Sequence, residues 1–476
     1  MTARKRRWFL ALAAALSGCG ERTAPKAPGA PETFPGVALK LSAEKGASYA
    51  DALRLRLPDF EARHQCKVQM VEAETPDSEA DVALTGGVGF AKLGERLSLS
   101  GNIASEPELL FVEFPFAYRT AFGARNREPA AFPFSTERLA LWYRSDLFAD
   151  AKLAAAYKSE SGRALAPPTT WAEYATIAKF FVKEKACKFG CAEAADGSRA
   201  GLRNLFARGA GNSLEPRTAL LDAETAKPRL TTPEMARALE QWQAALAHSP
   251  AAGKGSLSDR EARQAFAAGE AAMLVSLLPP FVELPNKPLA KIAENVAVTD
   301  LPAGAEIYDS RSKAWSPRQP NTKVPHFGGT GQFLSISAKT PHREACLALI
   351  RFLGDPKNTS YVVQGARLGL VPLRTELLND SGRFSSYGLS SQTLGRYFEL
   401  ISSGIRAPDW ATDLRIKSEA EFRKSLWTAL APALAGKTPP AEALAAAQKE
   451  WEKLVAAGGR DLLNEYRLGL QFTALR

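Results

Sequence analysis

A strand, a helix and a second strand follow one another where the folded part of the chain begins, and this order constrains the fold more than any other feature. Residues 37–44 (VALKLSAE) and 66–73 (CKVQMVEA) are predicted to be strands. Residues 48–64 between them are predicted to form a helix that Pro58 must kink or divide. Two strands joined through a helix lie parallel in one sheet. The order therefore predicts an α/β fold.

The third predicted strand, residues 80–87 (ADVALTGG), ends on Gly86 and Gly87. Open α/β sheets bind ligands beyond the carboxyl ends of their strands, which makes both glycines candidate ligand-binding residues. A tight turn explains the pair equally well. The sequence leaves both interpretations open.

Helix caps mark the rest of the chain as largely helical. Thr170 with Glu173, and Ser258 with Glu261, have the spacing of capping boxes. The Thr-Pro pair at residues 340–341 is predicted to begin another helix. Short strands lie between these helices, so the α/β class extends along the chain.

The first residues predict export. Residues 2–7 (TARKRR) are positively charged, a short apolar run follows, and Leu-Ser-Gly precedes Cys19. The apolar run is too short to span a bilayer, so residues 1–18 are predicted to be a signal peptide. The LSGC sequence resembles the bacterial lipobox, in which the cysteine is acylated. The alternative is an ordinary secretory signal with an incidental cysteine.

Residues 19–36 separate this signal from the folded part. They contain four prolines and almost no apolar side chain larger than alanine. Such a segment cannot bury a core, and we expect it to be an extended tether between the membrane and a folded body. The body, from about residue 37, is too long for one typical core and is expected to form two domains.

The charge of the chain does not indicate nucleic-acid binding. The formal net charge of +10 falls to +6 when the four basic residues of the signal are removed. The remaining Lys and Arg residues are interspersed with acidic ones. A solvated, mildly basic surface is the simpler interpretation, and export also removes nucleic acid as a partner.

Four cysteines follow Cys19. A local disulfide between Cys187 and Cys191 is predicted outside the cytoplasm, with Gly190 easing the tight loop. The spacing of this pair and the lack of a nearby histidine speak against a metal site. Cys66 and Cys346 are predicted to be small buried hydrophobic residues.

No catalytic motif is present in the sequence. The four histidines have no metal-ligand spacing, and no nucleophile elbow, dinucleotide-binding fingerprint or complete phosphate-binding loop occurs. We therefore predict a protein that is not an enzyme and has no cofactor and no metal.

Five segments occur in the order that is typical of family 1 extracellular solute-binding proteins. They are residues 132–148 (FPFSTERLALWYRSDLF), 167–179 (PPTTWAEYATIAK), 266–273 (FAAGEAAM), 328–353 (GGTGQFLSISAKTPHREACLALIRFL) and 365–378 (GARLGLVPLRTELL). Over nearly the whole mature body, the chain resembles this family, the receptor component of ABC importers for sugars and related solutes.

The resemblance implies a two-lobe periplasmic-binding-protein-like fold of type II, with a ligand cleft between lobes joined by hinge crossovers. Residues 132–148 would be the first crossover and residues 326–337 the return. The open form would bind a solute and close over it. The expected lobes are residues 37–139 plus 327–375 (lobe one) and residues 140–326 plus 376–476 (lobe two).

Candidate solute contacts come from aromatic side chains and from the crossovers. Trp315 and Trp410 lie in polar loops without a helical stripe, so they are candidates for stacking on a sugar ring. Trp142, in the first crossover, suits either core packing or the ligand. The resemblance adds the return crossover and the arginine after the family's proline, which suits a ligand hydroxyl, an anionic ligand group or a surface salt bridge. These residues are Phe327, Gly328, Gly329 and Arg374.

The sequence therefore predicts a monomeric, lipid-anchored binding protein of the cell envelope, facing the periplasm or exterior. It would pass a sugar, oligosaccharide, polyol or similar small solute to ABC permease subunits. One alternative is a receptor of the same fold that serves a sensor or another assembly. An exported enzyme on the same scaffold is less consistent with the missing catalytic motifs.

Overall fold

The structure is a computed structural model, and it describes most of the chain from residue 32 to residue 470. The residues outside the description are 1–31, 46, 48, 74–76, 78, 87–88, 90–92, 94, 100–102, 104–105, 116–117, 120–123, 126–127, 282–291, 320–323, 328–330, 367–368, 407–409, 412 and 471–476. The predicted signal peptide, Cys19 and most of the tether therefore lie outside the described residues, as do Gly87, Gly328 and Gly329.

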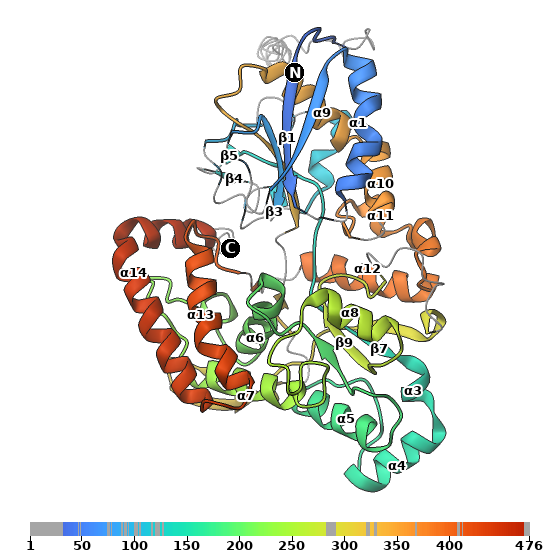
Figure 1. The fold of residues 1–476 in the computed structure, drawn as a ribbon, viewed down its shortest axis with the longest axis vertical. Coiled ribbons are helices and arrows are strands. Elements are labelled where there is room, and N and C mark those ends of the chain that lie inside the picture. Colours follow the sequence, from blue (N-terminus) through green and yellow to red (C-terminus); the bar gives the residue numbers. More distant parts are fainter. Residues whose placement is uncertain are drawn as a thin grey trace, which may run out of the picture.

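The elements form an upper and a lower group in Figure 1, which we call lobe one and lobe two. Lobe one is built on a five-stranded sheet in which the first three strands of the chain are parallel and β14 is antiparallel to its neighbours. The βαβ prediction is therefore confirmed. In sheet order the strands are β2 (Lys67–Ala73), β1 (Ala38–Glu44), β3 (Val82–Gly86), β14 (Gln332–Ile336) and β6 (Phe132–Pro133).

Helices from both ends of this lobe's sequence cover its sheet, with α1, α9, α10 and α11 to one side in Figure 1. Phe60 of α1 packs on Phe352 of α9 with ring centroids 5.5 Å apart, so two remote segments share one core. The elements are α1 (Ala50–His64), η2 (Pro107–Leu109), η3 (Phe111–Glu113), β4 (Ala124–Arg125), β5 (Glu128–Pro129), α9 (Arg343–Gly354), α10 (Pro356–Gly365) and α11 (Thr375–Leu378).

Lobe two has a second, four-stranded sheet. Its order is β10 (Val296–Thr299), β7 (Ala140–Arg144), β9 (Met273–Ser276) and β8 (Ala192–Glu193), and β7 is antiparallel to both of its neighbours. The surrounding helices are α3 (Ser145–Ala149), α4 (Ala151–Ser161), α5 (Trp171–Lys183), α6 (Arg199–Gly211), η5 (Pro216–Thr218), α7 (Pro233–Leu246), α8 (Asp259–Ala267) and η6 (Ala293–Asn295).

The C-terminal helices complete lobe two. The long helices α13 and α14 lie side by side at the left of Figure 1 (red). The bounds of the helices are η7 (Ser381–Tyr387), α12 (Ser391–Ile405), α13 (Glu419–Leu434) and α14 (Pro440–Leu470). Two further pairs of strands are β11 (Glu306–Asp309) with β12 (Ala314–Pro317), and β13 (His326–Phe327) with β15 (Trp410–Ala411). Within residues 32–470 as described, no helix is long and apolar enough to cross a membrane.

The helix caps bear out part of the sequence analysis. Both predicted capping boxes are present, at the starts of α5 and α8. Helix α9 begins at Arg343 with His342 at its N-cap position, so the Thr-Pro pair at 340–341 lies just before the helix. Thr340 Oγ1 accepts from the backbone N–H of His342. Helix α1 continues through Pro58 and is not divided there.

The ordered contacts begin slightly before the predicted start of the folded body. The backbone N–H of Phe34 donates to His64 O at 2.7 Å, and the two rings stack with centroids 6.0 Å apart. Phe34, near the end of the predicted tether, is therefore held against α1.

Candidate functional site

Three chain segments that join the lobes lie side by side. Thr136, in the first crossover, forms a β-bridge with Val371. On the return crossover the backbone N–H of Gln332 donates to Ser135 Oγ at 3.0 Å. Gly331 has φ +26°, and a Cβ atom there would lie 2.0 Å from Ser135 O, so only glycine permits this approach. The three connections therefore contact one another in one compact bundle between the lobes.

The lobes meet at the carboxyl end of the parallel strands. A cavity of about 20 Å³ lies there, with room for about one water molecule. Lobe one contributes the ends of β1, β2 and β3, and α6 of lobe two contributes its first residue. The residues that line the cavity are Ala43, Glu44, Ala73, Leu84, Thr85, Gly86, Gly89 and Arg199.

Arg199 is placed by the start of α6. Ser198 caps this helix by accepting from the backbone N–H of Gly201 at 3.2 Å. The Arg199 guanidinium donates to Glu419 at 3.3 Å, and 30% of its side chain is exposed. Its Nε is buried and has no hydrogen-bond partner among the described residues. Arg199 therefore has donor capacity beyond its ion pair with Glu419.

A buried ionic cluster lies one helical turn further along α6. Arg203 contacts Asp413 at 2.6 Å and Glu137 at 3.0 Å. Burial disfavours the charge of Arg203, but Asp413 and Glu137 outweigh it and raise the pKa of the guanidinium. Burial raises the pKa of Glu137, with Arg203 opposing the shift. Since Glu137 belongs to the first crossover, Arg203 ties α6 to the connecting segments.

Gly86 and Trp410 lie near this junction. Gly86 ends β3 and lines the cavity. Trp410 is only 5% exposed and its ring meets that of Tyr118 edge-on, with centroids 6.1 Å apart. The strand that carries Trp410 pairs with β13, where Phe327 is the partner of Ala411.

Two predicted ligand residues are instead core residues, which corrects the sequence analysis. Trp142 is 0% exposed and packs on Tyr397 with centroids 4.8 Å apart, because β7 is an inner strand of its sheet. Arg374 is 1% exposed and donates to the carbonyl groups of Leu109 and Gly354. Its guanidinium binds segments of lobe one together and is neither a surface salt bridge nor open to a solute.

Trp315 lies away from the junction. Its hairpin, β11–β12, is attached to the end of α6, where the backbone N–H of Tyr308 donates to Asn212 O. Arg199 is at the opposite end of this 13-residue helix, roughly 18 Å away. One face of the Trp315 ring is covered by Arg237, whose guanidinium carbon is 3.4 Å from the ring centroid.

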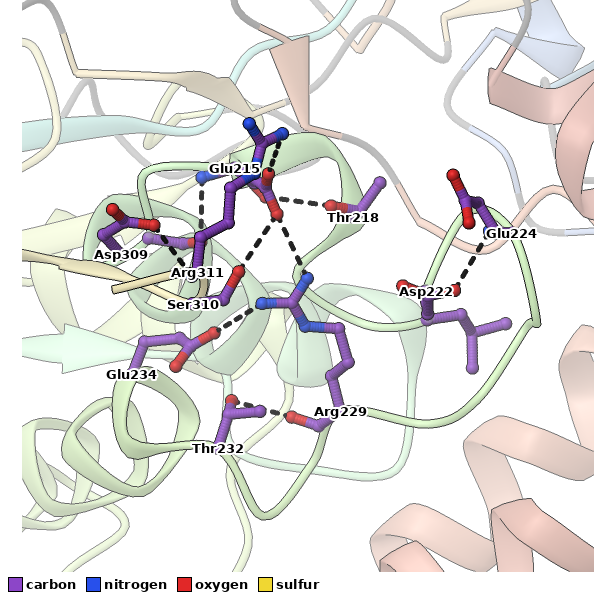
Figure 2. Close-up of polar contacts among 12 residues, drawn as sticks. Glu215, Thr218, Asp222, Glu224, Arg229, Thr232, Glu234, Asp309, Ser310 and Arg311 are labelled. Carbon is purple, nitrogen blue, oxygen red and sulfur yellow. Dashed lines mark hydrogen bonds and ion pairs between the residues drawn. The ribbon is translucent and has the colours of Figure 1, made fainter. Parts of the chain in front are cut away.

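Figure 2 shows how this hairpin is fixed to lobe two. Glu215 accepts from Arg311 at 2.9 Å, from Ser310 at 3.2 Å and from Arg229 at 3.4 Å. Arg229 in turn donates to the buried carboxylate of Glu234 at 3.2 Å. These contacts hold the turn between β11 and β12 against lobe two.

The predicted Cys187–Cys191 disulfide is absent, since both residues are free thiols. The Cys187 thiol donates to Phe189 O at 2.9 Å, and the Cys191 thiol donates to Ala245 O at 3.2 Å. Burial raises the pKa of Cys187 to about 11 and raises that of Cys191 as well. The two thiols therefore donate hydrogen bonds to different carbonyl groups. Cys66 and Cys346 are buried, as predicted.

Sequence reasoning missed the charged residues at the junction. The cap at Ser198 signals the start of a helix, but nothing local indicates that Arg199 faces the end of β1, more than 150 residues earlier in the chain. The partners of Arg203 are equally remote. Among the described residues, no cluster of three or more His, Cys, Asp or Glu side chains is arranged to hold a metal ion.

Solved structures share this architecture. A maltose-bound MalE3 of T. maritima matches with a TM-score of 0.66 and 18% identity, over 88% of this chain and 100% of that chain. A solute-binding protein of Agrobacterium radiobacter in complex with ribitol matches with a TM-score of 0.66 and 20% identity, over 89% of this chain and 100% of that chain. A solute-binding protein of Agrobacterium vitis with bound D-mannitol matches with a TM-score of 0.67 and 17% identity, over 89% of this chain and 99% of that chain. These likenesses confirm the two-lobe fold.

A family comparison identifies the chain. No curated protein matches it in sequence. The family model of bacterial extracellular solute-binding proteins matches residues 116–388, which is more than half of the chain. Members of this family are binding proteins, in agreement with the prediction that the chain is not an enzyme. The chain belongs to the family of bacterial extracellular solute-binding proteins.

Proposed function

We propose that the protein is a lipid-anchored solute-binding protein that delivers a sugar, polyol or related polar solute to an ABC importer. The observation that carries this proposal is the cavity between the carboxyl ends of β1–β3 and the start of α6, beside the bundle of connecting segments. A site between lobes that share a hinge suits a ligand that is enclosed by closure.

The similar structures support the choice of solute. They were solved with maltose, ribitol and D-mannitol, which are all neutral and polyhydroxylated. The lobes proposed for closure are residues 37–139 plus 327–375 and residues 140–326 plus 376–476. The proposed backbone surface beside the solute consists of Gly86, Gly87, Phe327, Gly328 and Gly329. Trp410 is the aromatic residue that we propose beside it.

A thermal-shift panel tests the solute class. The folded body, residues 32–476, is melted with maltose, ribitol, D-mannitol, D-tagatose and oligosaccharides of glucose. A solute at a hundred times its Kd adds about 2.7 kcal/mol to the free energy of unfolding, which raises the melting temperature by a few degrees. We expect a selective increase with one solute class. If calorimetry also finds no binding to any member, the proposed function is wrong for sugars and polyols.

The lipid anchor depends on Cys19 and is tested separately. When the full chain is expressed in bacteria, we expect it to incorporate labelled palmitate and to sediment with membranes. Cys19→Ser should abolish the label and release the protein, because two or more acyl chains are needed for stable anchoring. Cys66→Ser is the matched control and should keep both properties. Equal labelling of Cys19→Ser would contradict the anchor.

A further inference from the structure

We propose that Arg199 and Glu44 form a clamp across the cleft, with lobe two contributing the cation and lobe one the carboxylate, and that this clamp selects a neutral polyhydroxylated solute over its phosphate ester. The inference rests on the proposed function and specifies its ligand. Both side chains line the cavity between the lobes. Among the described residues of lobe two, Arg199 is the one that lines this cavity.

Arg199 supplies hydrogen-bond donors. A guanidinium has five N–H donors, and the ion pair with Glu419 uses Nη2 at 3.3 Å. The buried Nε has no partner in the described part of the chain, although an unpaired buried donor costs free energy. A solute hydroxyl oxygen in the cleft would satisfy this remaining capacity.

Glu44 supplies the complementary acceptor. It is the last residue of β1, its side chain is exposed, and no ion pair to it occurs among the described residues. A carboxylate only accepts hydrogen bonds, whereas a guanidinium only donates them. A hydroxyl group does both, so adjacent hydroxyl groups can bridge Arg199 and Glu44 where a phosphate cannot.

The charges around the cavity disfavour an anionic solute. Arg199 and Arg423 both bind Glu419, and Arg203 lies between Glu137 and Asp413. Glu44 is the carboxylate that lines the cavity itself. A phosphate in the cavity would meet the carboxylate of Glu44, and like charges at close range cost binding free energy.

The cavity is too small to hold the proposed solute. A space of about 20 Å³ does not hold a sugar ring, so the lobes must separate before a solute enters. Closure would then bring Arg199 and Glu44 onto opposite sides of the solute.

A matched pair of variants tests the clamp. Arg199 and Arg423 both contact Glu419, but only Arg199 lines the cavity between the lobes. Calorimetry would measure the Kd of each variant for the solute that the thermal-shift panel identifies. We expect Arg199→Gln to raise the Kd about 10- to 100-fold, since it removes charge-assisted hydrogen bonds. Arg423→Gln should stay within about threefold of the wild type.

The solute class is tested with the same wild-type protein. D-Mannitol is compared with mannitol 1-phosphate, and maltose with maltose 6′-phosphate. We expect the neutral member to bind at least about tenfold more tightly. Glu44→Gln should narrow this difference, because it removes one of the repelling carboxylates. Circular dichroism of each variant without solute verifies that it is folded.

The outcomes separate the two proposals. If a solute binds the wild type and Arg199→Gln equally well, or if the phosphate ester binds more tightly, the clamp is wrong while the proposed function stands. If no member of the panel, neutral or phosphorylated, binds the wild type, the proposed function is wrong and the clamp is wrong with it.

Discussion

Replacing Glu193 with alanine is expected to lower the free energy of unfolding by about 3–5 kcal/mol. Both nitrogens of the Arg208 fork donate to Glu193 at 2.8 Å, and both side chains are 0% exposed. The guanidinium also lies against the ring of Trp171, with its carbon 3.9 Å from the centroid. Without Glu193, a full positive charge stays buried with no carboxylate to balance it. Urea denaturation, followed by tryptophan fluorescence, measures the loss.

Two further variants isolate the cause of this loss. Glu399→Ala removes the carboxylate of an exposed pair with Arg396 and should change stability by about 1 kcal/mol at most. The double variant Glu193→Met, Arg208→Met replaces the pair with apolar side chains of similar length. It should recover most of the stability, because neither charge then needs a partner. A Glu193→Ala variant as stable as Glu399→Ala would contradict the argument.

The parts of the fold that sequence predicted well depend on local signals. The parallel strands around α1 and the two capping boxes each lie within a few dozen residues, where hydrophobic pattern and side-chain chemistry act directly. The predicted helix start at the Thr-Pro pair is two residues too early, since α9 begins at Arg343. A Thr-Pro pair suits a helix start, but the Thr340 hydroxyl forms a turn with His342 instead.

The candidate site was predicted less well because its residues meet only in three dimensions. Arg374 follows a proline in a segment that suggested a surface, yet it binds the carbonyl groups of Leu109 and Gly354, which lie 265 and 20 residues earlier in the chain. Trp142 could be assigned to the core only once β7 was known to lie inside its sheet. No sequence pattern around Glu44 or Arg199 marks either residue as part of a site, since their proximity becomes apparent only in the folded structure.

Replacing Arg203 with methionine is expected to destabilise the protein by about 3–5 kcal/mol near pH 8. The guanidinium contacts Asp413 and Glu137 together, and all three side chains are largely buried. Methionine removes the charge and keeps much of the length of the side chain. Two neighbouring carboxylates would then be buried with less positive charge to balance them. The melting temperature and the urea midpoint both report this loss.

The loss of stability in Arg203→Met should become smaller as the pH falls. Burial raises the pKa of Glu137, and the loss of Arg203 removes the main influence that opposes this rise. A carboxyl group whose pKa is higher in the folded than in the unfolded state stabilises the fold when protonated, and this contribution is lost as the pH rises. Lowering the pH from about 8 to about 5 should therefore narrow the gap between Arg203→Met and the wild type.

The same variant tests whether Arg203 holds α6 to the hinge. Glu137 lies in the first crossover, and Asp413 follows the strand paired with the return crossover, so losing Arg203 frees α6 from both. We expect small-angle scattering at pH 8 to show a larger radius of gyration than for the wild type. Adding Glu137→Gln and Asp413→Asn removes the unbalanced charges without restoring the link. The free energy of unfolding should then return toward the wild-type value while the larger radius of gyration remains. If the radius of gyration also returned to the wild-type value, charge imbalance alone would open the lobes.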